Sequence, residues 1–159
     1  MENKYTFEQC DYSNPAHLNL LVTLLNEYME DPMGDHPPHN KLQQLRLVDA
    51  LANHPTATVV FAVHGDKGVG MAVCFELFST FKIKPYLYIH DFTVTKEYRN
   101  KGVGGALMNK LFEIGRQRKY CKVTLEVRDD NHPALTLYKK MGFVPCEPDM
   151  YFWGKDLTE

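Results

Sequence analysis

The sequence lacks the paired cysteines that zinc sites and redox motifs require. Its four cysteines are widely spaced and form no C-x-x-C pair: Cys10, Cys74, Cys121 and Cys146. His36 and His39 bracket two prolines in "HPPH", but no third ligand stands at a suitable spacing. We therefore expect free thiols and no metal site.

The chain also has no excess of positive charge and no long apolar run. The formal net charge is -2 and the pI is about 6.4, which disfavours a nucleic-acid partner. No apolar stretch approaches the length of a membrane span, and "MENKYTFEQC" lacks a cationic segment followed by an apolar core. These absences predict a cytoplasmic protein with no membrane segment and no nucleic-acid partner.

What is present is the composition of a globular domain. Of 159 residues, 44% are hydrophobic and 24% charged, which is enough apolar material for a core. No repeat, linker or low-complexity tract divides the chain. We expect one domain, residues 1–159.

Hydrophobic periodicity predicts alternating strands and helices along the chain. In the first half we expect a strand at Tyr5–Gln9, a helix beginning at Asn14 and Pro15, and, after a loop at Glu30–Asn40, a helix around Leu42–Leu51. A hairpin formed by Thr58–Val63 and Gly70–Phe78 follows. In the second half we expect strands at Tyr86–Val94, at "KVTLEV" (122–127) and at Tyr151–Trp153. Helices are expected between them, from Val103 to about Arg118 and at Pro133–Gly142.

The stretch "VTKEYRNKGVGGAL" (94–107) places three glycines, Arg99 and Lys101 between a strand and a helix. Such a turn directs backbone N–H groups and the positive end of the helix toward one point, which favours an anion. The alternative is a tight turn whose glycines only relieve backbone strain. A P-loop is absent, and Leu107 stands where a dinucleotide fingerprint needs a third small residue. The pattern that remains is Arg-x-x-Gly-x-Gly at Arg99, Gly102 and Gly104.

That pattern resembles the acyl-coenzyme A signature of the GNAT superfamily of N-acetyltransferases. The resemblance extends to "YIHDFTV" as the central strand, "KVTLEV" as the strand that splays from it, and "NHPALTLYKKMGFV", and covers roughly Gly70 to Val144. It implies an α/β (α+β) fold with a mixed, mostly antiparallel sheet, flanked by helices and splayed at its two central strands.

The resemblance also implies acetyl-CoA as cosubstrate. Backbone groups of Phe92, Thr93 and Val94 would pair with the pantetheine, and Asn131 would touch the cofactor. The pyrophosphate would lie on residues 99–105: Arg99, Asn100, Lys101, Gly102, Val103, Gly104 and Gly105. Tyr138 lies seven residues after Asn131, as the family's thiol-facing tyrosine does.

Acetyl transfer to an amine needs a base for the amine and a proton for the departing thiolate. Tyr138 is the candidate general acid; the alternative is that it is only an aromatic residue of the core. Neighbouring strand residues point to opposite faces, so we expect only one of His90 and Asp91 to face a given site. His90 is a candidate base or water-relay partner, or else a hydrogen-bonded structural histidine. The strand also resembles that of diamine acetyltransferases, which carries an acidic pair before the phenylalanine. Asp91 matches one acid of this pair, whereas His90 departs from the pattern. Asp91 is therefore expected to contact a cationic acceptor.

Other acids have weaker claims. Glu76 and Glu126 are expected to be structural or to lie at the rim of the site. An acidic cluster either forms a solvated face or attracts an amine, with Glu27 as the substrate-binding candidate: Glu27, Glu30, Asp31 and Asp35.

The sequence therefore predicts an acetyl-CoA-dependent N-acetyltransferase that acts on a primary amine of a small molecule, with di- and polyamines among the candidates. Direct transfer in a ternary complex is expected because no cysteine can be assigned as an acyl carrier. Two alternatives stay open: a non-catalytic acyl-CoA sensor and a peptide or protein N-acetyltransferase. The family commonly dimerises, so the resemblance implies a homodimer.

Overall fold

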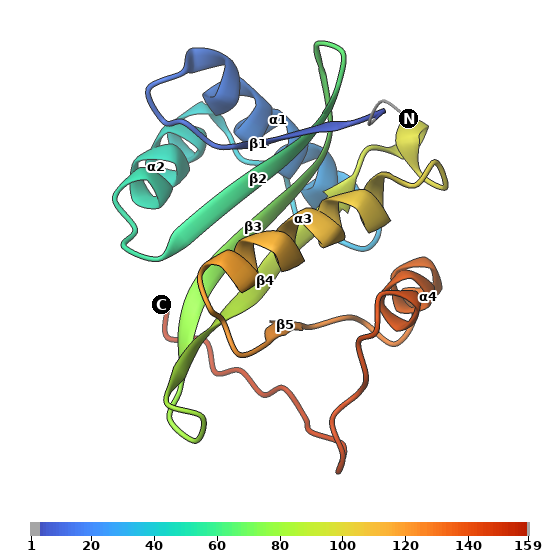
Figure 1. Cartoon of the computed structure of the whole chain (residues 1–159). Helices are drawn as coiled ribbons and strands as arrows, with labels where there is room; N and C mark the ends of the chain where they lie inside the picture. The colour runs from blue at the N-terminus through green and yellow to red at the C-terminus, as the bar shows by residue number, and fades with distance from the viewer. Residues whose placement is uncertain (1–3, 159) are drawn as a thin grey trace.

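A five-stranded sheet forms the centre of the computed structural model, which describes residues 4–158 (Figure 1). Its strands lie in chain order, β1-β2-β3-β4-β5. The first four are antiparallel, and β5 pairs with β4 in parallel. Their bounds are β1 Thr6–Gln9, β2 Ala57–His64, β3 Lys67–Ser79, β4 Lys84–Val94 and β5 Val123–Leu125.

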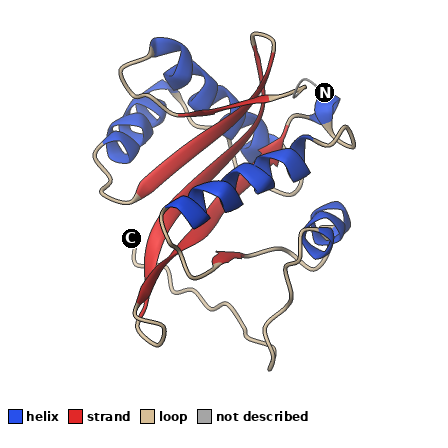
Figure 2. Cartoon of the chain, viewed as in Figure 1, coloured by secondary structure: helices blue, strands red, loops and turns tan. Residues whose placement is uncertain are grey.

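Helices cover both faces of the sheet (Figure 2). They are α1 Pro15–Glu30, α2 Lys41–Ala52, the short 3₁₀ helix η1 Lys96–Tyr98, α3 Val103–Gln117 and α4 His132–Lys140. On one face Leu21 and Leu24 of α1 pack with Phe61 and Met71. On the other face the apolar stripe of α3 packs on the opposite side chains of the same strands: Val103, Leu107, Met108 and Leu111. The mixed, mostly antiparallel sheet flanked by helices confirms the predicted fold class.

Local sequence explains where the helices begin. The Asn14 side chain accepts a hydrogen bond from the N–H of Ala16, and Pro15 occupies the first turn of α1. Asn40 and Gln43 form a reciprocal capping box on α2. Both caps satisfy N–H groups that the helices themselves leave unpaired.

The splay expected between the two central strands corresponds to a short β4–β5 ladder. Pairing runs only from Leu87 with Val123 to Ile89 with Leu125, whereas β4 continues to Val94. Strand β5 is therefore shorter than the predicted 122–127 segment. Beyond Ile89, within residues 4–158, no strand pairs with the β5-facing edge of β4.

The final strand predicted at Tyr151–Trp153 is wrong for the single chain. Residues 144–158 are all exposed and contain no helix or strand. Aromatic residues favour strands, but a strand needs an edge with which to exchange hydrogen bonds. This segment finds no such edge among the described residues.

All four cysteines are free, as expected. In the part of the chain that the structure describes, no cluster of three or more His, Cys, Asp or Glu side chains is arranged to hold a metal ion. None of the helices of residues 4–158 has both the length and the apolar character needed to cross a membrane.

Candidate active site

A β-bulge in β4 places His90 and Asp91 together. Val73 of β3 pairs with Asp91 and the next residue, Cys74, pairs with Ile89, so His90 is an extra residue in the ladder. The expectation that these neighbours face opposite sides is therefore wrong. Their side chains are joined instead, with His90 Nδ1 3.0 Å from Asp91 Oδ2. A regular strand alternates its side chains, and the extra residue breaks that alternation.

This pair combines an accessible imidazole with a mostly covered carboxylate. The His90 side chain is 57% exposed and that of Asp91 is 19% exposed. The hydrogen bond to Asp91 raises the pKa of His90, against the opposing effect of burial, and the charges of Asp91 and Glu126 add to the rise. The His90 side chain is therefore exposed, and its hydrogen bond to Asp91 makes its pKa higher than that of an ordinary histidine.

The glycine turn presents free backbone donors at the start of α3. Gly102 is the N-cap residue, in a left-handed conformation with φ +86°, and no side chain of residues 4–158 caps the helix. Asn100 is also left-handed, with φ +59°. Ala106 is the first residue of the helix whose N–H finds a partner, the Gly102 carbonyl, and within residues 4–158 no acceptor meets the N–H groups of residues 103–105. Those donors, together with the helix dipole, favour an anion there.

The three glycines of the turn serve different purposes. Gly102 needs its positive φ, although a Cβ there would meet nothing within 4 Å. A Cβ on Gly104 would lie 2.9 Å from Leu137 Cδ2, so this glycine lets α3 approach α4. At Gly105 a Cβ would meet only Met141 Sδ, at 3.9 Å.

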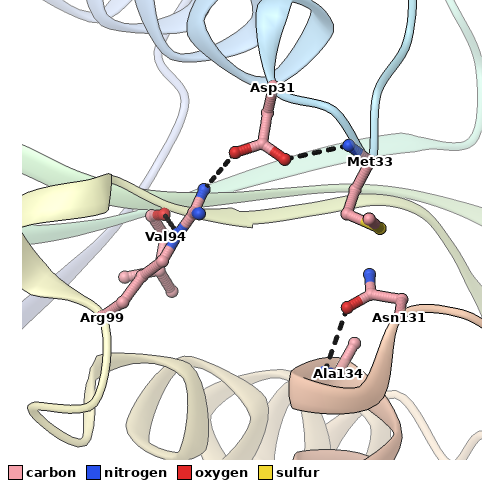
Figure 3. Close-up of polar contacts among 6 residues, drawn as sticks. All are labelled: Asp31, Met33, Val94, Arg99, Asn131 and Ala134. Carbon is pink, nitrogen blue, oxygen red and sulfur yellow. Dashed lines mark hydrogen bonds and ion pairs between the residues drawn. The ribbon is translucent and has the colours of Figure 1, made fainter.

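Arg99 bridges the turn, the end of β4 and the end of α1 (Figure 3). Its Nε donates to the Val94 carbonyl at 3.1 Å and its Nη2 donates to Asp31 Oδ2 at 2.7 Å. Burial by itself would raise the pKa of Asp31, but the Met33 N–H and the Arg99 guanidinium together lower it. The ion pair holds the guanidinium beside the open end of the β4–β5 gap.

An aromatic cluster near the β1–β2 edge of the sheet anchors the same turn. The Tyr5 hydroxyl donates to the Lys101 carbonyl at 2.9 Å, and His64 Nδ1 lies 3.1 Å from the Tyr98 hydroxyl. The His64 ring contacts both tyrosine rings edge-on, and Lys101 Nζ lies 5.2 Å from the centre of the Tyr98 ring. The turn is therefore fixed at η1 and again at Lys101.

Asn131 and Tyr138 both belong to the α4 region, across the gap from β4. Asn131 Oδ1 caps α4 by accepting from the Ala134 N–H at 3.2 Å, while its amide nitrogen points away from the helix, toward Met33 (Figure 3). Tyr138 is 8% exposed, and its ring packs edge-on against Phe92 of β4 and Phe143. Burial, and then the nearby Tyr28, raise the pKa of Tyr138 to about 12. Its phenol is therefore protonated at neutral pH.

Two further tyrosines, which the sequence analysis did not indicate, belong to the candidate site. Burial and the charges of Asp91 and Asp31 raise the pKa of Tyr28 in α1. Burial, Glu126 and Asp91 raise the pKa of Tyr88 in β4. Tyr28 looks like part of the apolar stripe of α1, whereas Tyr88 stands two residues before His90, a spacing that could have indicated the same face of the strand.

Glu27 lies apart from the His90–Asp91 pair. It lines a cavity of about 640 Å³ between α1, the start of α2 and η1, together with Glu30, Asp31, Lys96 and Arg99. His90 and Asp91 are not among the lining residues. The acidic cluster is thus divided: Asp31 is paired with Arg99, and Glu27 borders the glycine turn and not the pair on β4.

A splayed β4–β5 pair that opens beside an uncapped helix defines the class of acyl-CoA-dependent transferases that the sequence resembles. The family model described as "Acetyltransferase (GNAT) family" matches residues 21–143, and the chain belongs to this family.

Among curated proteins, the chain is 24% identical over 131 residues to thialysine N-epsilon-acetyltransferase of Caenorhabditis elegans, covering 82% of this chain and 79% of that protein. It is 41% identical over 59 residues to streptothricin acetyltransferase A of Bacillus subtilis (strain 168). That match covers 37% of this chain and only 34% of the length of the relative.

Solved structures share the fold at low sequence identity. A probable acetyltransferase superposes with a TM-score of 0.83 at 19% identity, over 97% of this chain and 99% of that chain. The aminoglycoside acetyltransferase meta-AAC0020 from an uncultured soil metagenomic sample, in complex with sisomicin, gives a TM-score of 0.80 at 18% identity, over 97% of each chain.

Proposed function

We propose that this chain is an acetyl-CoA-dependent N-acetyltransferase that acts on a primary amine of a small, cationic molecule. One observation carries the proposal. Among the described residues, β4 has no β5 partner beyond Ile89, and this stretch carries the joined His90–Asp91 pair, then Phe92, on which the buried Tyr138 packs, and then Val94, which Arg99 of the glycine turn contacts. These are the parts that transfer from a thioester to an amine requires.

The residues of the turn suit the anionic end of the cosubstrate. Unpartnered N–H groups at the start of α3, with Arg99 and Lys101 beside them, would hold its pyrophosphate. The edge of β4 at Phe92, Thr93 and Val94, which pairs with no strand of residues 4–158, would pair with its pantetheine, and the Asn131 amide nitrogen would reach the same gap. Acetyl-CoA, when bound, supplies the activated acetyl group.

Tyr138 would donate its phenolic proton to the departing sulfur. Full transfer from a phenol of pKa about 12 to a thiolate resembling Cys, of pKa about 8.5, is uphill by about 5 kcal/mol. That cost favours a proton transfer concerted with breaking of the carbon–sulfur bond. Burial of Tyr138 between Phe92 and Phe143 fixes the ring in one orientation for that step.

His90 would take the proton of the acceptor, directly or through water. An alkylamine of pKa about 10.4 is almost fully protonated at neutral pH, so the base must act before attack. Asp91 both orients the imidazole and, together with Glu126, gives this end of the gap a negative charge. A second cationic centre on the acceptor would find a counter-charge there.

The relatives favour the same substrate class, since streptothricin, thialysine and aminoglycoside acetyltransferases are all similar to this chain. Which amine is used is tested by a panel of diamines, polyamines, aminoglycosides, thialysine and peptide N-termini, with thiol release as the readout. Turnover of cationic small amines is expected, and Asp91→Asn should raise KM more for a diamine than for a monoamine. Binding of coenzyme A without any thiol release would favour a sensor, and turnover of peptides alone would favour a protein acetyltransferase.

A further inference from the structure

One face of the long β3–β4 hairpin carries a row of aromatic side chains beside the candidate catalytic pair. Neighbouring strand residues point to opposite faces, and Leu87 and Ile89 of β4 belong to the core on the α3 side of the sheet. Tyr86 and Tyr88 therefore lie on the other face, on which α1 and α2 pack. Phe75 of β3 is paired with Tyr88 in the ladder and packs on the core of that same face. The hairpin extends past α2 toward its turn, which leaves this end of the face open (Figure 1).

The aromatic row begins at His90. The centre of the His90 ring lies 5.9 Å from that of Phe75 and 5.9 Å from that of Tyr88, and both contacts are nearly perpendicular, at 87° and 89°. Leu77, two residues after Phe75 on the same face, is 41% exposed. The row therefore runs along β4 from His90 in the direction away from Phe92, over a surface that a ligand can reach.

This face already holds one ammonium group, which the chain itself supplies. Lys122 Nζ lies 4.6 Å from the centre of the Tyr86 ring, a distance at which a cation is attracted to the π face. Tyr88 stands two residues further along the strand, and its side chain is half-buried. Within residues 4–158, no cationic side chain lies over the Tyr88 ring. The Tyr88 ring is thus the place in this row where an ammonium group from outside the chain can bind.

Acidic side chains lie on both sides of the Tyr88 ring. Thr124 of β5 is paired with Tyr88, and the exposed Glu126 follows two residues later, on the same face. Burial and then the charge of Glu126 raise the pKa of the Tyr88 phenol, so this carboxylate lies close to the ring. Asp91 lies on the other side, bonded to His90. A π face bordered by carboxylates attracts alkylammonium ions.

We propose that the Tyr88 ring and the Glu126 carboxylate form a subsite for a second, non-reacting ammonium group of the acceptor. The inference rests on the proposed acetyl transfer at His90, and it narrows the acceptor class to compounds with two cationic centres on a flexible chain. The reacting nitrogen lies about 3 Å from the imidazole or from a bridging water, and the second nitrogen within about 6 Å of the Tyr88 ring centre. The separation of the two nitrogens then follows the spacing of the rings, roughly 6 Å, which about four methylene groups span.

Recognition by a ring differs from recognition by a carboxylate alone. The attraction acts between the positive charge and the π system and needs no N–H donor, so a trimethylated second nitrogen should still bind. A carboxylate acting alone would lose its charge-assisted hydrogen bond to the methylated group. A methylated acceptor therefore distinguishes the two modes.

Steady-state kinetics with acetyl-CoA tests the subsite with three acceptors: butylamine, diaminobutane and the diaminobutane whose second nitrogen is trimethylated. The measured quantity is the KM of butylamine divided by that of each dication, because general damage to the site cancels in this ratio. The ratio should exceed one in the parent, and Tyr88→Leu should lower it about 2- to 30-fold, the range that a cation–ring contact is worth. Tyr88→Phe keeps the ring and should keep the ratio. Tyr86→Leu is the matched control, because the Tyr86 ring already holds Lys122.

Two kinetic results would overturn the subsite and leave acetyl transfer in place. One is a ratio near one in the parent, and the other is a ratio that Tyr88→Leu does not change. In a series of diamines, KM should be lowest near four methylene groups. A KM independent of chain length would place the second ammonium group elsewhere.

Calorimetry without acetyl-CoA tests the subsite independently of turnover, with the trimethylated compound as the probe. The parent and Tyr88→Phe should bind it with similar affinity, and Tyr88→Leu should bind it about 2- to 30-fold more weakly. If this pattern appears but no amine is acetylated, the proposed function fails and the cation subsite stands. Equal binding by all three proteins contradicts the subsite.

Discussion

The glycines of the turn differ in how much an added side chain would change the free energy of unfolding. We predict that Gly102→Ala lowers the free energy of unfolding by about 1–2 kcal/mol, because the left-handed φ of +86° strains any residue with a Cβ. Gly105→Ala should instead be neutral or stabilising by up to about 1 kcal/mol, because it lies in a helix and its Cβ has room. Urea denaturation of both variants measures the difference. Equal effects would mean that the turn does not impose the conformation at Gly102.

Tyr138 is the residue whose hydroxyl can be removed with least disturbance. Tyr138→Phe keeps the ring contacts with Phe92 and Phe143, so folding and coenzyme A affinity should change little. Loss of a general acid should lower kcat by about 10²- to 10⁴-fold. Steady-state kinetics with the best amine of the panel measures it. Tyr12→Phe is the control, because the buried Tyr12 hydroxyl has no hydrogen-bond partner within residues 4–158. Near-normal turnover of Tyr138→Phe would reduce this residue to a core aromatic.

The His90–Asp91 pair predicts a pH dependence with a definite sign. His90 must be neutral to act as a base, and Asp91 raises its pKa above the ordinary value of about 6.5. Activity should therefore rise with pH through that elevated pKa. Asp91→Asn removes the negative partner, so the rising limb should move to lower pH, and His90→Gln should abolish it. A limb that stays in place in Asp91→Asn would assign the base to another group or to water.

At the scale of elements, the sheet supports the turn from a distance. Tyr5, just before β1, bonds the Lys101 carbonyl, and His64 of β2 contacts the Tyr98 hydroxyl. We predict that Tyr5→Phe weakens coenzyme A binding by about 2- to 10-fold, since loss of one hydrogen bond is worth about 0.5–1.5 kcal/mol, while kcat at saturation is unchanged. Calorimetry with coenzyme A measures the affinity, and Tyr12→Phe again serves as the control. If both variants bind equally, the turn is rigid without this anchor.

The predictability of elements followed how local their causes are. The cap at Asn14 and the β2–β3 hairpin depend on neighbours in sequence, and the sequence located both. The bulge at His90 depends on register against β3, which no pattern in the strand reveals. Tyr151–Trp153 carries the composition of a strand, but a strand also needs a partner edge, which composition does not supply. The sequence predicted the part of the candidate site that a motif indicates, the turn at 99–105. It did not indicate single aromatic residues such as Tyr28, because no motif includes them.

At the scale of the whole molecule, the two sides of the candidate site are unequally secured. β3 and β4 share a long ladder from Gly70–Val94 to Ser79–Lys84, whereas β5 is joined to β4 by three residue pairs. Local opening follows the number of such contacts, so the β5–α4 side should open more readily than the rest of the sheet. A cosubstrate that lies in the gap would contact both sides and make the β5–α4 side open less readily.

We therefore predict that coenzyme A protects residues 123–140 in hydrogen exchange, and not only the turn at 99–105. At a coenzyme A concentration 100 times its Kd, the free energy of unfolding should rise by about 2.7 kcal/mol. For a chain of this size that corresponds to a rise in Tm of roughly 5–10 °C. Hydrogen exchange with mass spectrometry and a thermal melt measure the two effects, with Arg99→Ala as a variant of weakened binding. Protection confined to the start of α3 would mean that the ligand rests on the turn alone and does not enter the gap between β4 and β5.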